Sequence, residues 1–443
     1  MSFESVLLEK LAAPQKNAIV GGPFGSNLVS KDYADQGTPV IRGQNMGGRW
    51  VNGEFAYVSA EKADALSPNK ARPGDLIFTQ RGTLGQVSIV PSGPYDEYIV
   101  SQSQMKVTLD PERADVHFLY YVFRSPEQLE YIQNTAIQTG VPHTNLGILK
   151  KTPLKLPPIR TQRRIAALLG AFDDRIDLLR ETNATLEAIA QALFKSWFVD
   201  FDPVRAKMEG RVPEGMDEAT AALFPDALVE SELGLVPEGW HYSRLKETCS
   251  YLNRGISPKY LEDGGVLVLN QKCIRDFSVD YAKGRRHDTT QRKIDGRELT
   301  KGDVLVNSTG VGTLGRVAQV LDLPEPAIVD SHVTVVRAGS PLSWPYLGQW
   351  MAKVQPEIED MGEGSTGQTE LSRAKLGEMP ILVPPKNVLT MFDAVIEPLK
   401  SRVALNEGSA RSLSTLRDTL LPRLISGQLR LPEAQSAAEE ALA

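Results

Sequence analysis

The sequence contains YADQGTPVIRGQNM at residues 33–46 and a second version of it, YLEDGGVLVLNQKC, at residues 260–273. The two stretches align without a gap and share a tyrosine, a glycine and a glutamine, the last being Gln44 and Gln271. Similarity within one chain identifies its structural unit before any single motif does. The repeat therefore predicts two copies of one unit.

Two further stretches recur in the same order. PGDLIFTQRGTLGQVSIV begins at Pro73, and KGDVLVNSTGVGTLGRVAQV, which is two residues longer, begins at Lys301. Ile99–Val100 recur as Ile328–Val329. Each copy shows short alternating apolar runs that are broken by Gly, Pro and Asn, a pattern typical of strands and turns. Each copy is predicted to contain a strand-rich α+β domain.

The pattern changes after the double prolines that end PLKLPP at Pro158 and PILVPP at Pro385. Apolar residues then recur at intervals of three and four, which indicates one long helix with a narrow seam in each copy. Asn183 and Asn406 fall in these seams, and a polar seam residue can fix the register of a helix pair. We expect the helices to pack antiparallel, with the two domains at opposite ends of a rod about 60 Å long. A generic helical hairpin is the alternative, but it does not explain why a domain precedes each helix.

Side chains of the first helix divide between its seam and its outer face. The seam residues are predicted to form the core of the helix pair; they are Ile165, Phe172, Ile176 and Leu193. The aromatic residues Phe194 and Phe198 point outward in the same projection and are candidates for a partner-binding surface.

Composition indicates a multidomain globular protein, with 41% hydrophobic and 23% charged residues. No apolar run is long enough to cross a bilayer, and MSFESVLLEKLAA at the N-terminus does not resemble a signal peptide, so we expect a cytoplasmic protein without membrane contact. Cys249 and Cys273 lack the spacing of a zinc site. The net charge of −6 argues against a simple nucleic-acid binder, although basic residues cluster at 150–164 and 283–293.

Two glycine-rich stretches are similar to nucleotide-binding motifs. Residues 310–315 fit GxGxxG, but RVAQVLDL after them reads as a strand, whereas a dinucleotide fingerprint opens a helix. Residues 362–369 carry Gln368 where a P-loop requires Lys. We therefore predict no catalytic residue and no metal site, and keep a nucleotide-binding enzyme as an alternative from a different class. A coiled-coil scaffold without DNA affinity is a third possibility, which leaves the repeated domains unexplained.

Motifs at the helix ends identify a family. PPIRTQRRIAAL from Pro157 matches a helix opening PPxxxQxxIAxxL, and LFKSWFVDFDPV from Leu193 matches LFxxWFxDFxPV. ELGLVPEGW from Glu232 and LLPRLISGQL from Leu420 match the entry to a second domain and the end of a second helix. In these motifs the chain resembles the specificity subunits of type I restriction-modification systems. The opening of the second helix, KNVLTMF, departs from the family pattern.

The resemblance implies a non-catalytic subunit in which each of two target-recognition domains reads one half of a bipartite, gapped, double-stranded DNA site. The helices would bind two methyltransferase subunits and, through them, restriction and translocase subunits. No cofactor is implied in this chain, because S-adenosylmethionine, ATP and Mg would belong to the partners. The same fold could also serve a methylation-only or other defence system.

The resemblance and the repeat together predict the domain boundaries. These are recognition domain 1 at 1–158, spacer helix 1 at 159–200, a linker at 201–236, recognition domain 2 at 237–385, spacer helix 2 at 386–427 and a flexible acidic tail at 428–443.

Loop side chains with paired donors and acceptors can distinguish base edges in the major groove. Such residues occupy corresponding positions in the two copies. The candidates for DNA contact in the first copy are Arg42, Gln44, Asn45, Gln80, Arg81, Thr83, His143, Thr144 and Asn145. Those in the second copy are Asn270, Gln271, Lys272, Asn307, Ser308, Thr309, Gln368 and Thr369, with Arg285 and Arg286 as phosphate or base contacts.

Overall fold

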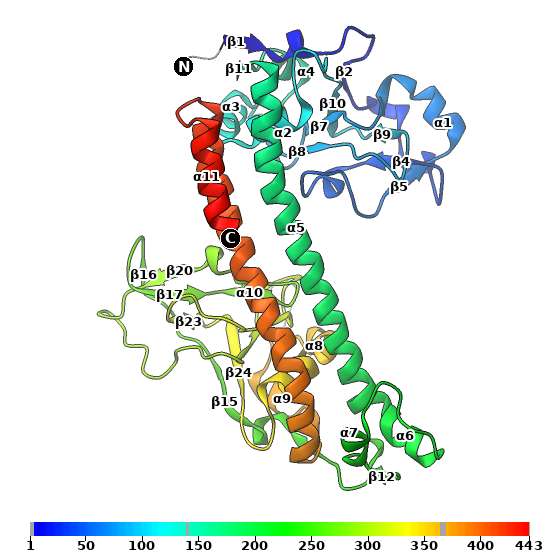
Figure 1. Cartoon of the computed structure of the whole chain (residues 1–443), viewed down its shortest axis with the longest axis vertical. Helices are drawn as coiled ribbons and strands as arrows, with labels where there is room; N and C mark the ends of the chain where they lie inside the picture. The colour runs from blue at the N-terminus through cyan, green and yellow to red at the C-terminus, as the bar shows by residue number, and fades with distance from the viewer. Residues whose placement is uncertain (1–3, 139–140, 364–368, 443) are drawn as a thin grey trace. The chain divides into compact units, whose positions relative to one another are not determined.

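The computed structural model describes residues 4–138, 141–363 and 369–442, and its chain divides into two compact units. Unit 1 comprises residues 1–178 and 409–443, and unit 2 comprises residues 179–408. The long helices α5 (Ile159–Lys195) and α10 (Lys386–Ile425) each contribute to both units (Figure 1). The predicted α+β class, with strand-rich regions joined by long helices, is confirmed.

Unit 1 is built on a four-stranded and a five-stranded sheet. The first has the order β2 (Ile19–Gly21), β10 (Gln104–Val107), β7 (Leu76–Thr79), β8 (Val87–Ile89). The second has the order β3 (Tyr33–Ala34), β5 (Ala56–Val58), β4 (Thr38–Ile41), β9 (Tyr98–Val100), β6 (Lys70–Ala71). In addition, β1 (Glu4–Leu7) pairs with β11 (Pro153–Leu156) just before α5 begins.

Unit 2 has two four-stranded sheets. One has the order β15 (Cys249–Arg254), β24 (Val333–Ala338), β21 (Val304–Asn307), β22 (Val317–Gln319). The other has the order β16 (Tyr260–Leu261), β20 (Arg285–His287), β17 (Val266–Leu269), β23 (Ala327–Val329). Here β14 (His241–Arg244) pairs with β25 (Pro380–Val383) just before α10 begins.

These strand orders repeat one topology. β15-β24-β21-β22 corresponds to β2-β10-β7-β8, and β16-β20-β17-β23 corresponds to β3-β5-β4-β9. Each unit also has one parallel pair, in which Val40 lies opposite Ile99 in unit 1 and Val268 lies opposite Ile328 in unit 2. The sequence repeat is thus confirmed at the level of strand register.

The gapless match at 33–46 and 260–273 was wrong by one residue. A Cβ added to Gly37 would lie 2.2 Å from the Val58 carbonyl oxygen, and one added to Gly265, rather than Gly264, would lie 2.2 Å from the His287 carbonyl oxygen. Unit 2 therefore carries one inserted residue before this close approach, where only glycine fits. Gln44 consequently corresponds to Lys272 and not to Gln271.

Helices complete each unit. Unit 1 contains α1 (Ala60–Ala65), α2 (Val116–Arg124), α3 (Pro126–Thr135) and α4 (Leu146–Lys150). Unit 2 contains α6 (Asp202–Met208), α7 (Glu218–Ala222), α8 (Trp344–Asp360) and α9 (Arg373–Gly377). The buried aromatic side chains of α2 and α8 supply much of the core, which fixes the sheets that carry the loops.

The aspartate of the repeated PGD and KGD motifs supports β7 and β21. Asp303 is fully buried and accepts two hydrogen bonds from the Arg337 guanidinium, at 2.6 and 2.8 Å. Asp75 is also buried, but its cation, the Lys106 ammonium, lies 3.6 Å away. A buried carboxylate needs such partners, so the repeated aspartate has a structural role in both copies.

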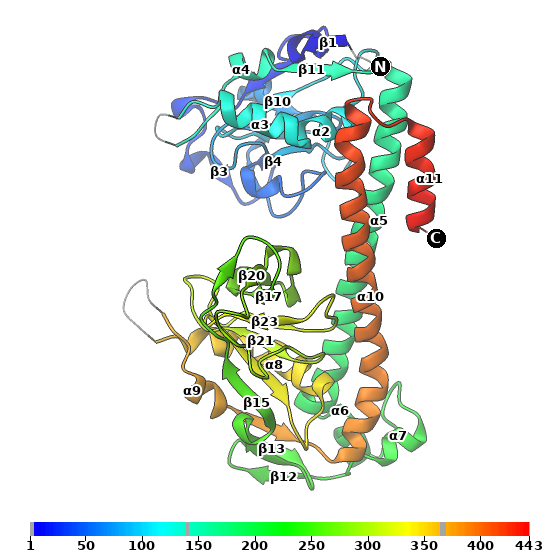
Figure 2. The ribbon, with the colours of Figure 1, turned by 90° about the vertical axis from the view of Figure 1, so that its left-hand side faces the viewer.

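Helices α5 and α10 pair antiparallel within each unit (Figure 2). In unit 2, the Asn406 Nδ2 donates to the Asn183 Oδ1 at 2.8 Å, and the Lys400 ammonium contacts Glu187 at 2.6 Å. In unit 1, Arg417 pairs with Asp173. The two predicted seam asparagines therefore meet.

Most of the predicted seam is buried. Ile165, Phe172 and Ile176 are buried, and Leu193 is partly buried against the core of unit 2. At its C-terminal end α5 passes into one π-helical turn (Ser196–Asp200).

The tail at 428–443 was expected to be flexible, but it contains a further helix, α11 (Leu431–Leu442). Leu431, Ala434 and Ala438 are buried on one face of it. Their spacing of three and four residues makes the segment amphipathic, and its alanines favour helix. The expectation was wrong because it weighed acidic composition above this periodicity.

Candidate nucleic-acid interface

In unit 2, several loops meet beside the end of β21. The Ser308 N–H donates to the His332 carbonyl, and the Leu371 N–H donates to the Ser308 carbonyl, both at 2.8 Å. The Asn307 Nδ2 donates to the Gln271 carbonyl at 3.2 Å, which ties the turn after β17 to the same place. Segments from four parts of unit 2 therefore form one surface.

The equivalent loops of unit 1 meet in the same way beside the end of β7. The Gln80 N–H donates to the Ser103 carbonyl at 2.7 Å, and the Thr144 N–H donates to the Gln80 carbonyl at 3.0 Å. Arg81 and His143 form an isolated β-bridge, as Thr309 and Glu370 do in unit 2. The backbone arrangement of the candidate surface is thus part of the repeat.

Asn45, predicted to contact DNA, instead holds its own loop together. It is fully buried, its Oδ1 accepts the Arg42 N–H at 3.0 Å, and its Nδ2 donates to the Asn52 and Glu54 carbonyls at 3.1 and 2.9 Å. Buried loop backbone requires such partners, so the prediction of a base contact for Asn45 was wrong.

Asn307 and Ser308 are likewise fully buried in unit 2. The Asn307 amide donates to the carbonyls of Gln271 and Thr313, and the Ser308 hydroxyl lies 2.6 Å from the Thr334 hydroxyl. The prediction that they contact DNA was also wrong, because their polar groups hold β21 to its neighbours.

Four more candidates belong to the structure of the loops. Gln80 and Thr144 are buried. The Asn145 Oδ1 accepts the Ile148 N–H and caps α4, and the Asn270 Oδ1 accepts the Lys272 N–H. A side chain that caps a helix or turn has fewer groups left for a base. These four are therefore weaker candidates than the residues that reach solvent.

The other candidates have exposed or partly exposed side chains. In unit 1 they are Arg42, Gln44, Arg81, Thr83 and His143, and in unit 2 they are Gln271, Lys272, Arg285, Arg286, Thr309 and Thr369. Gln368 lies outside the described residues. Their spread over both units is what two separate reading surfaces require.

His332 was missed by the sequence analysis. Its side chain is exposed, and its Nδ1 lies 2.8 Å from the Thr309 hydroxyl oxygen at the junction of the loops. His332 lies in the repeated segment DSHVTVV, which aligns with SQSQMKV in the first copy. This alignment could have identified His332 as a further candidate for DNA contact.

Arg285 and Arg286 have different environments. Arg286 forms an ion pair with Glu325, with one contact at 2.9 Å, and this guanidinium holds the pKa of the Glu325 carboxyl below its ordinary value. Arg285 instead stacks on Tyr260, with its guanidinium carbon 3.3 Å from the ring centre. Arg286 is therefore the weaker candidate of the two for DNA contact.

Residues 310–315 form the turn between β21 and β22, which are paired antiparallel. Gly310, Gly312 and Gly315 have φ values of 109°, 70° and 83°, in the left-handed region that glycine favours. A strand follows and not a helix, so the turn lacks the helix N-terminus that a dinucleotide site requires. The alternative of a nucleotide-binding enzyme built on this motif is rejected.

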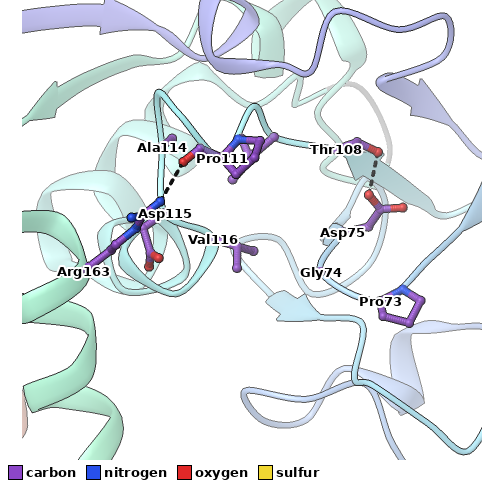
Figure 3. A pocket seen from close by; sticks show the side chains of 10 residues that line it. Pro73, Gly74, Asp75, Thr108, Pro111, Ala114, Asp115, Val116 and Arg163 are labelled. Atoms are coloured by element: carbon purple, nitrogen blue, oxygen red, sulfur yellow. Dashed lines mark hydrogen bonds between the residues drawn. The ribbon is translucent and has the colours of Figure 1, made fainter. Parts of the chain in front are cut away.

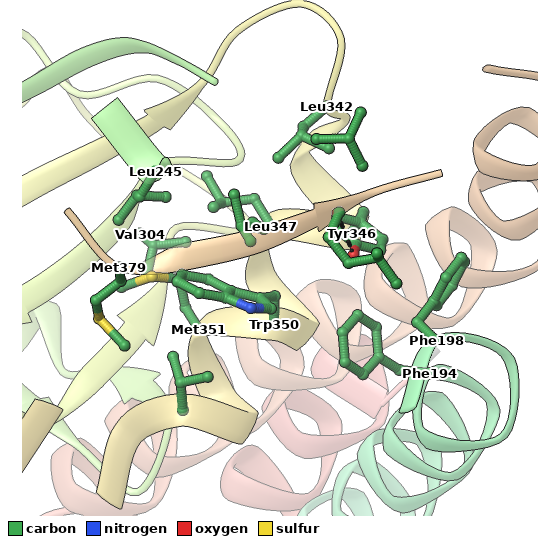
Figure 4. Close-up of a cluster of buried hydrophobic side chains, with 14 of the residues drawn as sticks. Phe194, Phe198, Leu245, Val304, Leu342, Tyr346, Leu347, Trp350, Met351 and Met379 are labelled. Carbon is green, nitrogen blue, oxygen red and sulfur yellow. Dashed lines mark hydrogen bonds between the residues drawn. The ribbon is translucent and has the colours of Figure 1, made fainter. Parts of the chain in front are cut away.

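Phe194 and Phe198 do not form an exposed surface. They are 3% and 4% exposed, and both pack against Tyr346 of α8 (Figure 4). Both also contact the ring of Phe392 of α10. Trp240 covers Phe198 as well. The prediction of a partner-binding role was wrong because the end of α5 is enclosed on its outer face by the core of unit 2.

A pocket in unit 1 is separate from these loops. It is lined by residues that include Asp75, Thr108 and Arg163 (Figure 3), and Asp75 precedes β7, whereas the candidate loop follows it. Thr108 donates to Asp75 at 2.5 Å, and Arg163 donates to the Pro111 carbonyl at 3.1 Å. The polar groups of the pocket are thus already engaged.

The part of the chain that the structure describes contains neither a cluster of metal ligands nor a helix that could span a membrane. Its His, Cys, Asp and Glu side chains form no cluster that could hold a metal ion. None of the described helices has an apolar stretch long enough for a membrane.

Comparison with known proteins supplies the family. Residues 25–188 match the family model of the type I restriction modification DNA specificity domain. The chain is 25% identical over 431 residues to the HindI specificity subunit of Haemophilus influenzae, an alignment that covers 86% of this chain and 92% of the relative. This chain belongs to the type I specificity subunits.

A second relative and a solved structure agree with this assignment. The MjaIX specificity subunit of Methanocaldococcus jannaschii is 23% identical, with 94% of this chain and 92% of the relative covered. The S subunit from M. genitalium has the same fold, with a TM-score of 0.55, 17% identity and 96% of each chain covered. The chain is accordingly the DNA specificity component of a type I restriction-modification system, a non-catalytic subunit.

Proposed function

We propose that the two units of this specificity subunit read the two halves of a bipartite, gapped DNA site. The observation that carries the proposal is the repeated loop junction at the ends of β7 and β21, where equivalent backbone hydrogen bonds hold different side chains. A shared scaffold with different exposed groups suits recognition of two different base sequences.

The proposed recognition domains extend over residues 1–158 and 237–385, with helices at 159–200 and 386–427 between and after them. The helices bind two methyltransferase subunits and, through them, restriction and translocase subunits, as the family resemblance implies. S-adenosylmethionine, ATP and Mg act in those partners. The complex works in the cytoplasm, where it has access to DNA.

Because the net charge of the chain is −6, the proposal requires that partner subunits contribute to DNA binding. Phosphate contacts dominate the affinity of most DNA-binding proteins and come from Lys and Arg. Among the described candidate residues, the exposed cations are Arg81, Lys272 and Arg285, which are too few to supply all of these contacts. The methyltransferase subunits would supply the rest, so the complete complex is the correct sample for binding measurements.

Single-molecule mapping of adenine methylation in the native genome tests the proposal, with this gene present and with it deleted. A gapped, two-part motif that is methylated only when the gene is present is the expected result. Unchanged methylation in the deletion strain would contradict the proposal.

A further inference from the structure

Arg285 has an environment that no other candidate residue in the described parts of the chain shares. Its side chain is exposed, its guanidinium lies flat against the ring of Tyr260, and none of the described carboxylates lies within ion-pair distance of it. The adjacent Arg286 has its charge balanced by Glu325. One of two neighbouring guanidinium groups is therefore held in place but left free to bind.

The strand register places Arg285 next to the candidate surface of unit 2. Arg285 lies opposite Val268 in β17, and this strand ends at Leu269, directly before the turn that carries Gln271 and Lys272. That turn is the one tied to β21 through Asn307. The backbone of Arg285 thus lies near the end of the sheet where the loops meet.

The stacked geometry favours a base over a phosphate as the ligand. A guanidinium presents its donors in a planar fork, which matches the O6 and N7 acceptors of guanine in the major groove. Stacking on an aromatic ring fixes the plane of this fork and lowers the entropy lost on binding. A phosphate also accepts a bidentate guanidinium, but a Lys can bind it as a point charge, so a phosphate contact does not require the fixed plane of a stacked Arg.

We propose that Arg285 reads a guanine in the half-site bound by unit 2, and that Tyr260 is a positioning residue for it. This inference rests on the proposed function. In unit 1, Ala56 lies opposite Val40 where Arg285 lies opposite Val268, although Tyr33 stands where Tyr260 does. The guanidinium contact therefore belongs to one half-site alone.

The test measures binding of the complete methyltransferase complex to duplexes that carry the mapped methylation motif. Each guanine is replaced in turn by 7-deazaguanine, which lacks the N7 acceptor. We expect one replacement, in a single half-site, to weaken wild-type binding by about 5- to 150-fold. Arg285→Ala, which removes every donor, should bind the unmodified site about as weakly and should no longer respond to that replacement.

Neighbouring variants separate reading from folding. Arg286→Ala is the matched control and should keep the response to 7-deazaguanine. Tyr260→Leu should reduce that response, whereas Tyr260→Phe, which keeps the aromatic face, should restore it. A general loss of structure would instead affect both half-sites and the thermal stability of the complex.

Three results would overturn the inference. Arg285→Ala could keep the full response to 7-deazaguanine, no guanine in either half of the mapped motif could respond to the replacement, or Arg285→Ala could weaken binding of all sequences equally. In the last case the slope of log affinity against log salt falls by about one, which identifies a phosphate contact. If the wild-type complex itself shows no sequence preference, the proposed function fails, independently of Arg285.

Discussion

Units 1 and 2 are most alike where backbone groups tie the loops together and most different where side chains reach solvent. The Gln80 and Ser308 amides make equivalent hydrogen bonds. Exposed Gln44 corresponds to exposed Lys272, and His143 corresponds to Glu370. The repeat therefore preserves a scaffold for loops and leaves the side chains that could contact bases free to diverge.

The largest expected effect concerns the aromatic cluster in which unit 2 encloses the end of α5. Phe198→Ala should lower the free energy of unfolding by about 3–5 kcal/mol, because a buried phenylalanine leaves a cavity. Phe24, which is 70% exposed in unit 1, is the control, and Phe24→Ala should change stability by less than about 0.5 kcal/mol. Urea unfolding of the purified chain would show this, and equal effects would refute the assignment of Phe198 to the core.

A smaller difference is expected between the two repeated aspartates. Asp303→Asn removes the acceptor of a charged, forked hydrogen bond and should destabilise unit 2 by about 1.5–3 kcal/mol. Asp75→Asn should cost less, because the Lys106 ammonium is 3.6 Å from the carboxylate. Hydrogen exchange of the backbone amides in β21 and β7 measures the stability of each unit separately. A larger loss of protection in β7 with Asp75→Asn than in β21 with Asp303→Asn would contradict the predicted order.

The helix pair has an amide pair beside the Lys400–Glu187 ion pair in unit 2, whereas unit 1 has the Arg417–Asp173 ion pair. Asn406→Ala should destabilise unit 2 by about 1 kcal/mol, because the Asn183 Oδ1 loses its donor. Leu405→Ala, at an exposed neighbouring position, is the control. Thermal unfolding should separate the two variants, and indistinguishable melting temperatures would mean that the amide pair adds no stability.

The smallest effect expected is a dependence of stability on pH that comes from Asp393 in unit 2. Burial raises the pKa of Asp393 to about 6, and Ala166 occupies the corresponding place after Pro158 in unit 1. The protonated carboxyl is favoured in the fold, so its contribution is complete below pH 4 and is lost as the pH rises to about 6. Asp393→Asn should remove this dependence. Above pH 6, the free energy of unfolding of Asp393→Asn should exceed that of the wild type by less than about 1 kcal/mol, because the side chain is only half-buried.

Equilibrium unfolding of wild type and Asp393→Asn between pH 4 and pH 7 would measure this difference. Parallel stability curves for the two proteins over that range would contradict it.

The repeat and the helices could be predicted from sequence because their signals are periodic and extend over many residues. The two seam asparagines were found in this way, and the structure joins them. The strand-rich class followed from the alternating runs around β7 and β21. In both cases the hydrophobic pattern reports the burial that stabilises the element.

The roles of individual polar residues could not be predicted in the same way. Asn45 and Gln44 are adjacent in the sequence and chemically alike, yet one is buried and the other exposed. Phe198 was assigned to the outside because a helical projection shows one packing partner and not the second layer that encloses it. The single insertion near Gly265 became visible through the strand register and through the carbonyl that the Gly265 backbone approaches.

The most direct test of the proposal that each unit reads its own half-site combines two matched variants with two altered DNA sites. Gln44→Ala and Lys272→Ala change equivalent exposed positions in units 1 and 2, and each duplex has one half of the mapped motif scrambled. With the whole methyltransferase complex, each variant should weaken binding of the intact site. It should also lose part of its discrimination at one half only, with different halves for the two variants. If both variants lost discrimination at the same half, or at both halves equally, the claim that each unit reads its own half-site would be contradicted.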